Sequence, residues 1–387
     1  MTPKHRPWTV ILLVALAYVG LTLARYGGDP LAFALMGTRY SQGDAQGSQG
    51  YDGQFAYYIA RDPIDGWRHC DVPAYRYQRI LYPLMARALA LGQPKAVGWT
   101  LIGLNVAALV GGTYFTEQLL ATRGVSRWFA LTYGLYGGLM AGLRLDLTEP
   151  LAYGLVQAGL WAWQDCRWQV ADCRLQVTGR RSSFTDCNGP LAMVLLALAA
   201  LAKETALIVV AGLLLHLALE QRWREAWKLG LAVGIPFAAW QAVLWAWLGK
   251  PGVGAGGAMT TFFEWLPFAG LMRVAMVSWP AFWLLLAIEG PLFVLPTIWA
   301  LTVSVRDLLR GERHPWITVL LVQAATLPFL PFSTWREPLA MARLAVGLVA
   351  ATLLYGTLHR SRRVLTYSLF WLATLALLIN ESVLPSA

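Results

Sequence analysis

Charged side chains that could bind anions or exchange protons gather at three short turns between apolar runs. Each turn combines basic and acidic residues near membrane depth, where ionisable groups are costly and usually face a bundle interior or a water-filled cavity. We interpret the turns as parts of one functional site, although a solvated turn with a local ion pair is the simpler alternative for each. Their charged residues are Arg144, Asp146 and Glu149, then Lys203 and Glu204, then Arg336 and Glu337.

A long polar segment near the N-terminus carries further candidates. Tyr51-Asp52-Gly53-Gln54 precedes a stretch, 55–60, whose aromatic and apolar spacing predicts a short interfacial helix. Asp52 lies at the start of this helix, where the free N–H groups and the positive end of the helix dipole favour an acid. A plain helix cap is therefore the alternative to a chemical role for Asp52.

Two arginines follow in the same segment. Arg76 and Arg79 are three positions apart, so a helix would place both on one face. Guanidinium groups are suited to bidentate binding of phosphate. The polar segment therefore predicts an anion-binding surface close to Asp52.

The elements that must position these residues are membrane helices. The chain is 57% hydrophobic and 13% charged over 387 residues, against roughly 25% charged in an average soluble domain. We therefore expect residues 1–387 to form one all-α polytopic membrane domain. The net charge of +10 does not indicate a nucleic-acid partner, because many basic residues fall in short connections between apolar runs, as the positive-inside rule predicts for cytoplasmic loops.

Parity of the crossings predicts the topology. The N-terminus is cytoplasmic, 8–24 is a retained first span and not a cleaved signal peptide, 25–79 and 249–279 are extracytoplasmic loops, and 165–189 is a cytoplasmic loop. The run 191–219 must cross twice, with Lys203-Glu204 at its tip. We expect a multi-pass protein of the bacterial inner membrane. The basic connections used are Arg123 with Arg127, Arg167 to Arg181, Arg222 to Lys228, Arg306 to Arg313, and His359 to Arg363.

No cofactor is predicted. Cys70, Cys166, Cys173 and Cys187 include no C-x-x-C pair, so neither zinc nor a disulfide framework is indicated. Acids are numerous enough for a divalent metal, but no ligand spacing identifies one. The glycine-rich stretch 249–257 lacks the residue order of a nucleotide-binding P-loop.

The polar segment resembles the first outer loop of the GT-C class of membrane glycosyltransferases, most closely its mannosyltransferase-like branch. The likeness rests on Asp52, on Tyr57-Tyr58-Ile59-Ala60 and on Tyr82-Pro83-Leu84. Leu-Thr-Glu149-Pro150-Leu and Ala-Lys203-Glu204-Thr205-Ala are similar to hairpin-tip motifs of related bacterial membrane proteins. The resemblance covers about the first 85 residues well, the middle to about residue 210 loosely, and the last third in topology only.

The sequence departs from that class at one position. Many relatives carry two adjacent acids in this loop, whereas here Gly53 follows Asp52, and Asp44 and Asp62 are more distant. Which acid is catalytic therefore stays open.

The resemblance implies a GT-C-like bundle of roughly 10–12 transmembrane helices, with short interfacial helices in its first outer loop. It implies transfer of a hexosyl or pentosyl group from a polyprenyl-phosphate carrier to a glycan, lipid or protein hydroxyl on the extracytoplasmic face, within membrane lipid. Asp52 would be the general base, and the cations would hold the lipid phosphate. The candidate substrate-binding residues are Tyr51, Gln54, Tyr58, Arg76, Arg79, Arg144, Asp146, Glu149, Lys203, Glu204, Arg336 and Glu337.

Two other functions stay open. A transporter or flippase for a lipid-linked or anionic solute would use the same cations, although no convincing internal repeat of the transporter kind is present. A non-catalytic scaffolding subunit is the third. The enzyme interpretation expects Asp52, Arg144, Lys203 and Arg336 to converge on one cavity, and scattered placement would rule it out.

Overall fold

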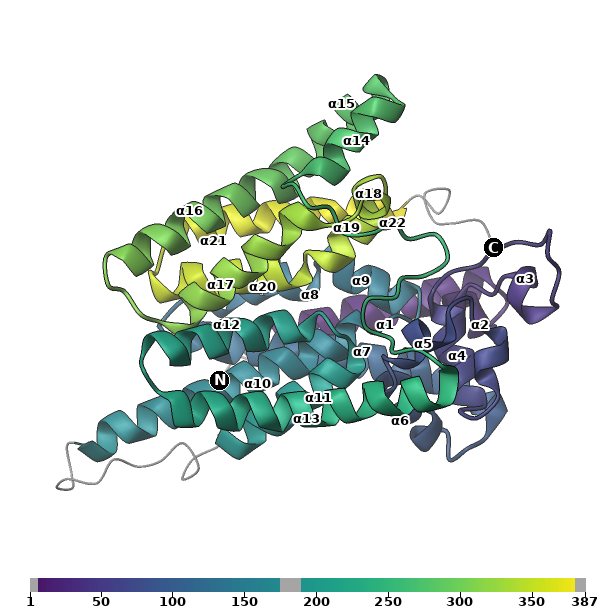
Figure 1. Cartoon of the computed structure of the whole chain (residues 1–387), viewed down its shortest axis with the longest axis horizontal. Coiled ribbons are helices and arrows are strands. Elements are labelled where there is room, and N and C mark those ends of the chain that lie inside the picture. The colour runs from purple at the N-terminus through teal and green to yellow at the C-terminus, as the bar shows by residue number, and fades with distance from the viewer. Residues whose placement is uncertain (1–5, 175–188, 380–387) are drawn as a thin grey trace.

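The computed structural model describes residues 6–174 and 189–379, with the side chains described for all of these residues except 165–174 and 379. Within these ranges every regular element is a helix. Most of the long helices lie side by side along the longest dimension of the molecule (Figure 1). The predicted cytoplasmic loop 165–189 is partly helical, because α10 (Glu149–Arg174) extends through Arg174. Residues 175–188 of that loop lie outside the described residues.

Among the described residues, four helical segments are long and apolar enough to cross a membrane, or five if one bent pair counts as a single span. A helix rises 1.5 Å per residue, so about 20 residues cross the hydrocarbon core. The described part of the chain is thus all-helical with four to five candidate spans, consistent with an all-α membrane protein; the larger number expected from sequence stays a prediction. The segments are α1 (Pro7–Arg25), Pro94–Ala121 with α7 (Val97–Ala121), α13 (Trp223–Leu248), Trp279–Leu309, and α19 (Pro338–Leu344) bent by 50° against α20 (Val346–Leu358).

Shorter apolar helices complete the bundle. The run 191–219 is divided into α11 (Gly189–Ala202) and α12 (Ala206–Leu219), with Lys203, Glu204 and Thr205 between them. The other short helices in the bundle are η3 (Arg127–Ala130), α8 (Leu131–Gly134), α9 (Gly137–Arg144), α17 (Pro315–Thr326), η6 (Leu327–Phe329), α21 (Arg362–Ser368), η7 (Leu369–Leu375) and α22 (Ala376–Ile379). The candidate span Trp279–Leu309 consists of α15 (Trp279–Glu289), η5 (Gly290–Val294) and α16 (Leu295–Leu309).

Small residues allow these helices to pack closely. A Cβ atom on Gly212 of α12 would lie 2.5 Å from the Cα of Val319 on α17, and one on Gly154 of α10 would lie 2.8 Å from the carbonyl oxygen of Ala108 on α7. Backbone approach at small residues is a common way for helices to associate where lipid removes the hydrophobic driving force. The bundle therefore holds α10 between α7 and α11, and α12 against α17.

The polar segment folds into short helices at one end of the bundle (Figure 1). The predicted interfacial helix at 55–60 lies within one of them, α4 (Gly53–Arg61). This end also holds 249–279, which contains α14 (Ala269–Val277). The short helices are α2 (Leu31–Ala34), α3 (Thr38–Ser41), α4 (Gly53–Arg61), η1 (Gly66–His69), α5 (Pro73–Tyr77), α6 (Leu81–Leu89), η2 (Pro94–Ala96) and, later in the chain, α18 (Phe332–Trp335).

Basic connections meet at the opposite end. Arg123 Nη2 lies 3.1 Å from His314 Nε2, and Arg313 Nη1 donates to the carbonyl oxygen of Leu219 at 2.7 Å. Arg127 Nη1 bonds the buried carboxylate of Glu117 at 2.7 Å. The helices thus separate these basic connections from the end that carries the polar segment.

Candidate functional site

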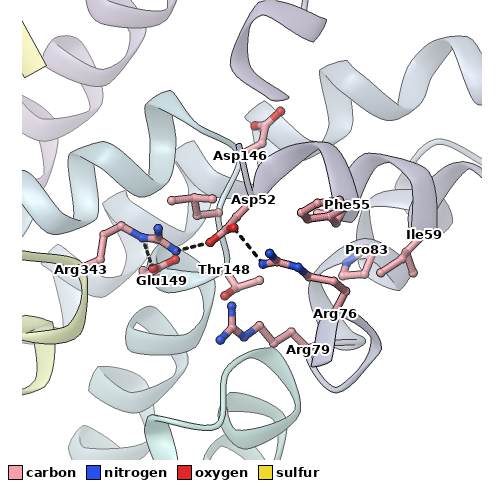
Figure 2. A pocket seen from close by; sticks show the side chains of 12 residues that line it. Asp52, Phe55, Ile59, Arg76, Arg79, Pro83, Asp146, Thr148, Glu149 and Arg343 are labelled. Carbon is pink, nitrogen blue, oxygen red and sulfur yellow. Dashed lines mark hydrogen bonds and ion pairs between the residues drawn. The ribbon is translucent and has the colours of Figure 1, made fainter. Parts of the chain in front are cut away.

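A narrow pocket opens where α4, the α5–α6 region, the turn before α10 and α19 meet (Figure 2). Its cavity volume is about 30 Å³. Most of its polar lining is charged, and this charge comes from four stretches far apart in the chain. The lining residues are Asp52, Phe55, Ala56, Ile59, Arg76, Arg79, Pro83, Asp146, Leu147, Thr148, Glu149 and Arg343.

Asp52 lies at the centre of the ion pairs. It is the N-cap residue of α4, but its carboxylate makes no capping hydrogen bond, so the plain-cap alternative does not describe it. Arg76 Nη1 instead donates to Oδ1 at 2.8 Å and Arg343 Nη2 donates to Oδ2 at 3.1 Å (Figure 2). Burial alone would raise the pKa of Asp52, but Arg76 and then Arg343 outweigh it and hold this pKa well below its usual range.

Gly53 lets α4 approach the turn before α10. A Cβ atom at this position would lie 2.0 Å from the carbonyl oxygen of Leu145. This contact brings the N-terminal end of α4 beside Leu147 and Thr148, so Asp52 and Glu149 line the same pocket.

Arg76 is fixed from both sides. Its Nε and Nη2 atoms donate to the two carboxylate oxygens of Asp71 at 2.7 and 2.8 Å, and its guanidinium carbon lies 4.2 Å from the ring centroid of Phe55. Asp71 also accepts from the backbone N–H of Val72 and Ala258 at 2.7 and 3.0 Å. Burial alone would lower the pKa of Arg76, but the carboxylates of Asp52 and Asp71 outweigh burial and hold this pKa above its usual value. Arg76 therefore stays charged.

Arg343 joins the polar segment to the membrane helices. From α19 it donates through Nε to Glu149 Oε1 at 2.7 Å, through Nη1 to the Tyr51 hydroxyl at 2.7 Å, and through Nη2 to Asp52. It was missed in the sequence because no acid lies beside it in the chain. A detectable signal was present: Arg343 is a lone charge inside the apolar run 339–358.

The turn between α11 and α12 supplies two further ion pairs. Lys203 Nζ donates to Glu149 Oε1 at 2.7 Å, and both side chains are almost fully buried. Arg79 binds Glu204 through two hydrogen bonds, of 2.9 and 2.5 Å, and also donates to the Tyr75 hydroxyl at 2.7 Å. Asp71 and Tyr75, like Arg343, were not among the predicted site residues.

Tyr51 and Glu337 border this network. The Tyr51 hydroxyl donates to Glu337 Oε1 at 3.1 Å and accepts from Arg343. Burial raises the pKa of Tyr51 despite the nearby Arg343, so its hydroxyl keeps its proton.

Other predicted residues lie outside the network. Arg336 is exposed and stacks at 5.8 Å over Phe332, so it does not converge with Asp52 and Lys203. Arg144 donates to the carbonyl oxygen of Ala32 at 2.8 Å and is not among the pocket-lining residues. The convergence of Asp52, Arg144, Lys203 and Arg336 on one cavity, expected from the sequence, is therefore not found.

Gln54 and Tyr58 hold the polar segment together. The Gln54 side chain accepts from the backbone N–H of Gly37 at 3.0 Å and donates to the carbonyl oxygen of Gln49 at 2.7 Å. The Tyr58 ring stacks on His69, with 4.5 Å between centroids. Both residues therefore shape the loop without lining the pocket.

Asp146 lines the pocket but points away from the ion pairs (Figure 2). Its φ of 49° places it in the left-handed region, and its buried carboxylate has no hydrogen-bond partner among the described residues. It contributes backbone shape to the turn before α10.

A separate group that could hold a metal ion lies elsewhere among the described residues. It consists of Asp307, Glu312 and His359, whose ligand atoms lie within 4.8 Å of one another. Asp307 already accepts from the Tyr355 hydroxyl at 2.5 Å and from Arg306. This group does not touch the pocket.

No family model, curated protein or solved structure matches this chain. Function has to be argued from the site itself. The site offers guanidinium groups that suit a phosphate and carboxylates that can accept a proton or a hydroxyl hydrogen bond.

Proposed function

We propose that this chain is an integral membrane glycosyltransferase that moves a sugar from a polyprenyl-phosphate carrier to an acceptor hydroxyl on the extracytoplasmic face. One observation carries the proposal: Asp52 lies between Arg76 and Arg343 in a pocket at the end of an apolar helical bundle. A carboxylate beside paired guanidinium groups combines a proton acceptor with an anion site. The bundle end is where a lipid-borne phosphate would meet a water-soluble or lipid acceptor.

In the proposed reaction the acceptor oxygen attacks the anomeric carbon of the donor sugar. Its proton passes to Asp52, while the bond between the anomeric carbon and the phosphate oxygen breaks and its electron pair leaves with the lipid phosphate. A single displacement of this kind inverts the configuration at the anomeric carbon. Arg76, Arg79 and Arg343 stabilise the charge that develops on the leaving phosphate.

The remaining groups position these three arginines. Glu149 receives Arg343 and Lys203 on the same oxygen, and Asp71 orients Arg76. Preorganised charges cost no rearrangement at the moment of reaction, which is why such supporting pairs contribute to rate.

The direct test is Asp52→Asn in purified protein reconstituted in nanodiscs, assayed with polyprenyl-phosphate sugars and a panel of hydroxyl acceptors. Loss of the base is expected to lower turnover about 10²- to 10⁴-fold. Asp65→Asn is the matched control, because it breaks an exposed Asp–Arg pair of the same loop, with Arg68 at 3.0 Å, outside the pocket. Unchanged turnover in a well-folded Asp52→Asn variant would remove Asp52 as the base.

A flippase for lipid-linked or anionic solutes is the second candidate, and polar residues below the pocket favour it. Tyr153 and Gln157 follow Glu149 at one-turn intervals on α10, and the polar side-chain atoms of the buried Gln157 have no partner among the described residues. Such a stripe could accompany a headgroup into the bundle. Transbilayer movement of a fluorescent lipid phosphate without sugar transfer would favour this function over the transferase.

A further inference from the structure

The charges of the ion-pair network are balanced. Ion pairs of 2.5–3.1 Å join four cations to four carboxylates. Each of these cations therefore has a carboxylate partner within the described structure, and an incoming anion must compete with one of those carboxylates. The cations are Arg76, Arg79, Lys203 and Arg343, and the carboxylates are Asp52, Asp71, Glu149 and Glu204.

Two of the carboxylates are held too firmly to move aside. Asp71 is bound by both Arg76 and two backbone N–H groups, and its side chain is 5% exposed. Glu149 is fully buried between Lys203 and Arg343. Displacing Glu149 would leave a charge uncompensated in the interior, which is strongly unfavourable.

Asp52 is the more displaceable of the remaining two. Its side chain is 30% exposed, it makes no capping bond, and its two partners, at 2.8 and 3.1 Å, come from separate parts of the chain. Glu204 is 27% exposed but binds a single arginine, Arg79, in the stronger two-bond arrangement. An incoming anion with several oxygens can therefore displace the Asp52 carboxylate and bind between Arg76 and Arg343.

We propose that the Asp52 carboxylate occupies, in the resting protein, the place between Arg76 and Arg343 that the phosphate of the ligand takes, so that binding exchanges one anion for the other. The identity of the ligand as a lipid phosphate rests on the proposed function. A phosphate carries more charge and more acceptor oxygens than a carboxylate, so it competes well for two guanidinium groups.

The exchange also activates Asp52. Once the phosphate holds Arg76 and Arg343, the carboxylate loses two hydrogen bonds that favour its charged form and becomes a stronger proton acceptor. Arg79 and Tyr51, which also act electrostatically on Asp52, do not supply an equivalent pair of hydrogen bonds. Base strength is thereby linked to the presence of the donor.

The test measures binding of a polyprenyl monophosphate without sugar to the full chain in nanodiscs. Asp52→Asn removes the internal competitor and is expected to tighten binding roughly three- to tenfold. If Asp52 instead helped to bind the ligand directly, Asp52→Asn would bind the polyprenyl monophosphate more weakly than the wild type. Asp65→Asn should bind like the wild type. Inorganic phosphate is titrated in parallel. Tighter binding of both probes by Asp52→Asn indicates a site for free phosphate, and tighter binding of the lipid alone indicates that the polyprenyl chain is held beside the site.

A second variant guards against a folding artefact. In Asp52→Asn/Arg343→Lys the site keeps its charge but has lost the planar guanidinium group that can hold two phosphate oxygens, so the gain in affinity should disappear while Asp52→Asn alone keeps the wild-type unfolding temperature. Unchanged or weaker binding by a folded Asp52→Asn overturns the exchange, even where sugar transfer is observed. Tighter binding without transfer of any sugar contradicts the transferase and leaves the exchange standing. If neither the wild type nor Asp52→Asn binds the lipid phosphate or inorganic phosphate, both the exchange and the proposed transferase function are overturned.

Discussion

At Asp52, burial and two guanidinium groups act in opposite directions on one carboxyl group. The effect of Arg76 and Arg343 exceeds that of burial, so the pKa of Asp52 is held below its usual range. A carboxylate in this state is a stable anion but a weak base. Asp52, the base predicted from the sequence, must therefore lose its pairing with these guanidinium groups before it can accept a proton.

This predicts two different acid limbs in the pH profile of sugar transfer. kcat/KM reports the free enzyme, in which Asp52 is ionised at every pH above its depressed pKa, so its acid limb lies below the ordinary aspartate value of about 3.9. kcat reports the complex, in which Arg76 and Arg343 have moved to the phosphate, so its limb lies at higher pH. Steady-state rates from pH 4 to 8 check this: kcat/KM should show no acid limb in this range while kcat does, and the same pH dependence of both would contradict it.

Arg343 is predicted to be needed for folding as well as activity. Arg343→Ala removes three hydrogen bonds and leaves Glu149 buried with Lys203 alone. Breaking a buried ion pair costs about 3–5 kcal/mol, so the thermal midpoint should fall clearly. Arg343→Lys keeps the charge but cannot reproduce the three-way geometry, so it should retain more stability than activity.

Arg336→Ala is the matched control for Arg343. It lies seven positions earlier, is exposed, and contacts Phe332 by stacking. Little change in either stability or transfer is expected, because exposed substitutions away from special features are usually mild. A large loss of transfer in Arg336→Ala would show that the site extends beyond the described network.

Among the elements, α4 depends on one glycine for its position. Because a Cβ on Gly53 would lie 2.0 Å from the Leu145 carbonyl oxygen, Gly53→Ala must push the start of α4 away from the turn before α10. A displacement near 1 Å can cost about 10²-fold in rate, so transfer should fall by this order while the protein remains folded. Gly103→Ala on α7, which meets nothing within 4 Å, is the control. Equal activity of the two variants would refute the role of Gly53.

The bend between α19 and α20 explains why one predicted turn was assigned to the wrong arginine. The sequence placed the turn at Trp335 to Pro338 and favoured Arg336 beside Glu337. In the structure a further helix, α19, follows this turn before the 50° bend, and it carries Arg343 into the pocket. Spacing along the chain does not reveal such a break.

The whole molecule has two chemically different ends. The pocket and the short helices of the polar segment lie at one end, and basic connections such as Arg313 and Arg123 meet at the other. The positive-inside rule then predicts that the basic end is cytoplasmic.

This orientation can be measured in a cysteine-free background in intact cells. A membrane-impermeant maleimide should label Ala45→Cys, which is exposed beside the pocket end, and should label Arg310→Cys at the basic end only after the membrane is opened. The reverse pattern would place the pocket in the cytoplasm and would exclude transfer on the extracytoplasmic face.

Sequence alone determined the class of the protein and the chemical types at its pocket. Composition and apolar runs are properties of the chain that need no partner, so they predicted an all-helical protein with helices suited to a membrane. Asp52, Arg76 and Arg79 were found because they are close together in the chain. Tertiary structure decided which distant charges join them: Arg343, Glu149 and Lys203, and not Arg144 or Arg336. The physical reason is that each helical residue turns its side chain by about 100°, so the face that a lone charge presents depends on helix packing and bends that no local pattern encodes.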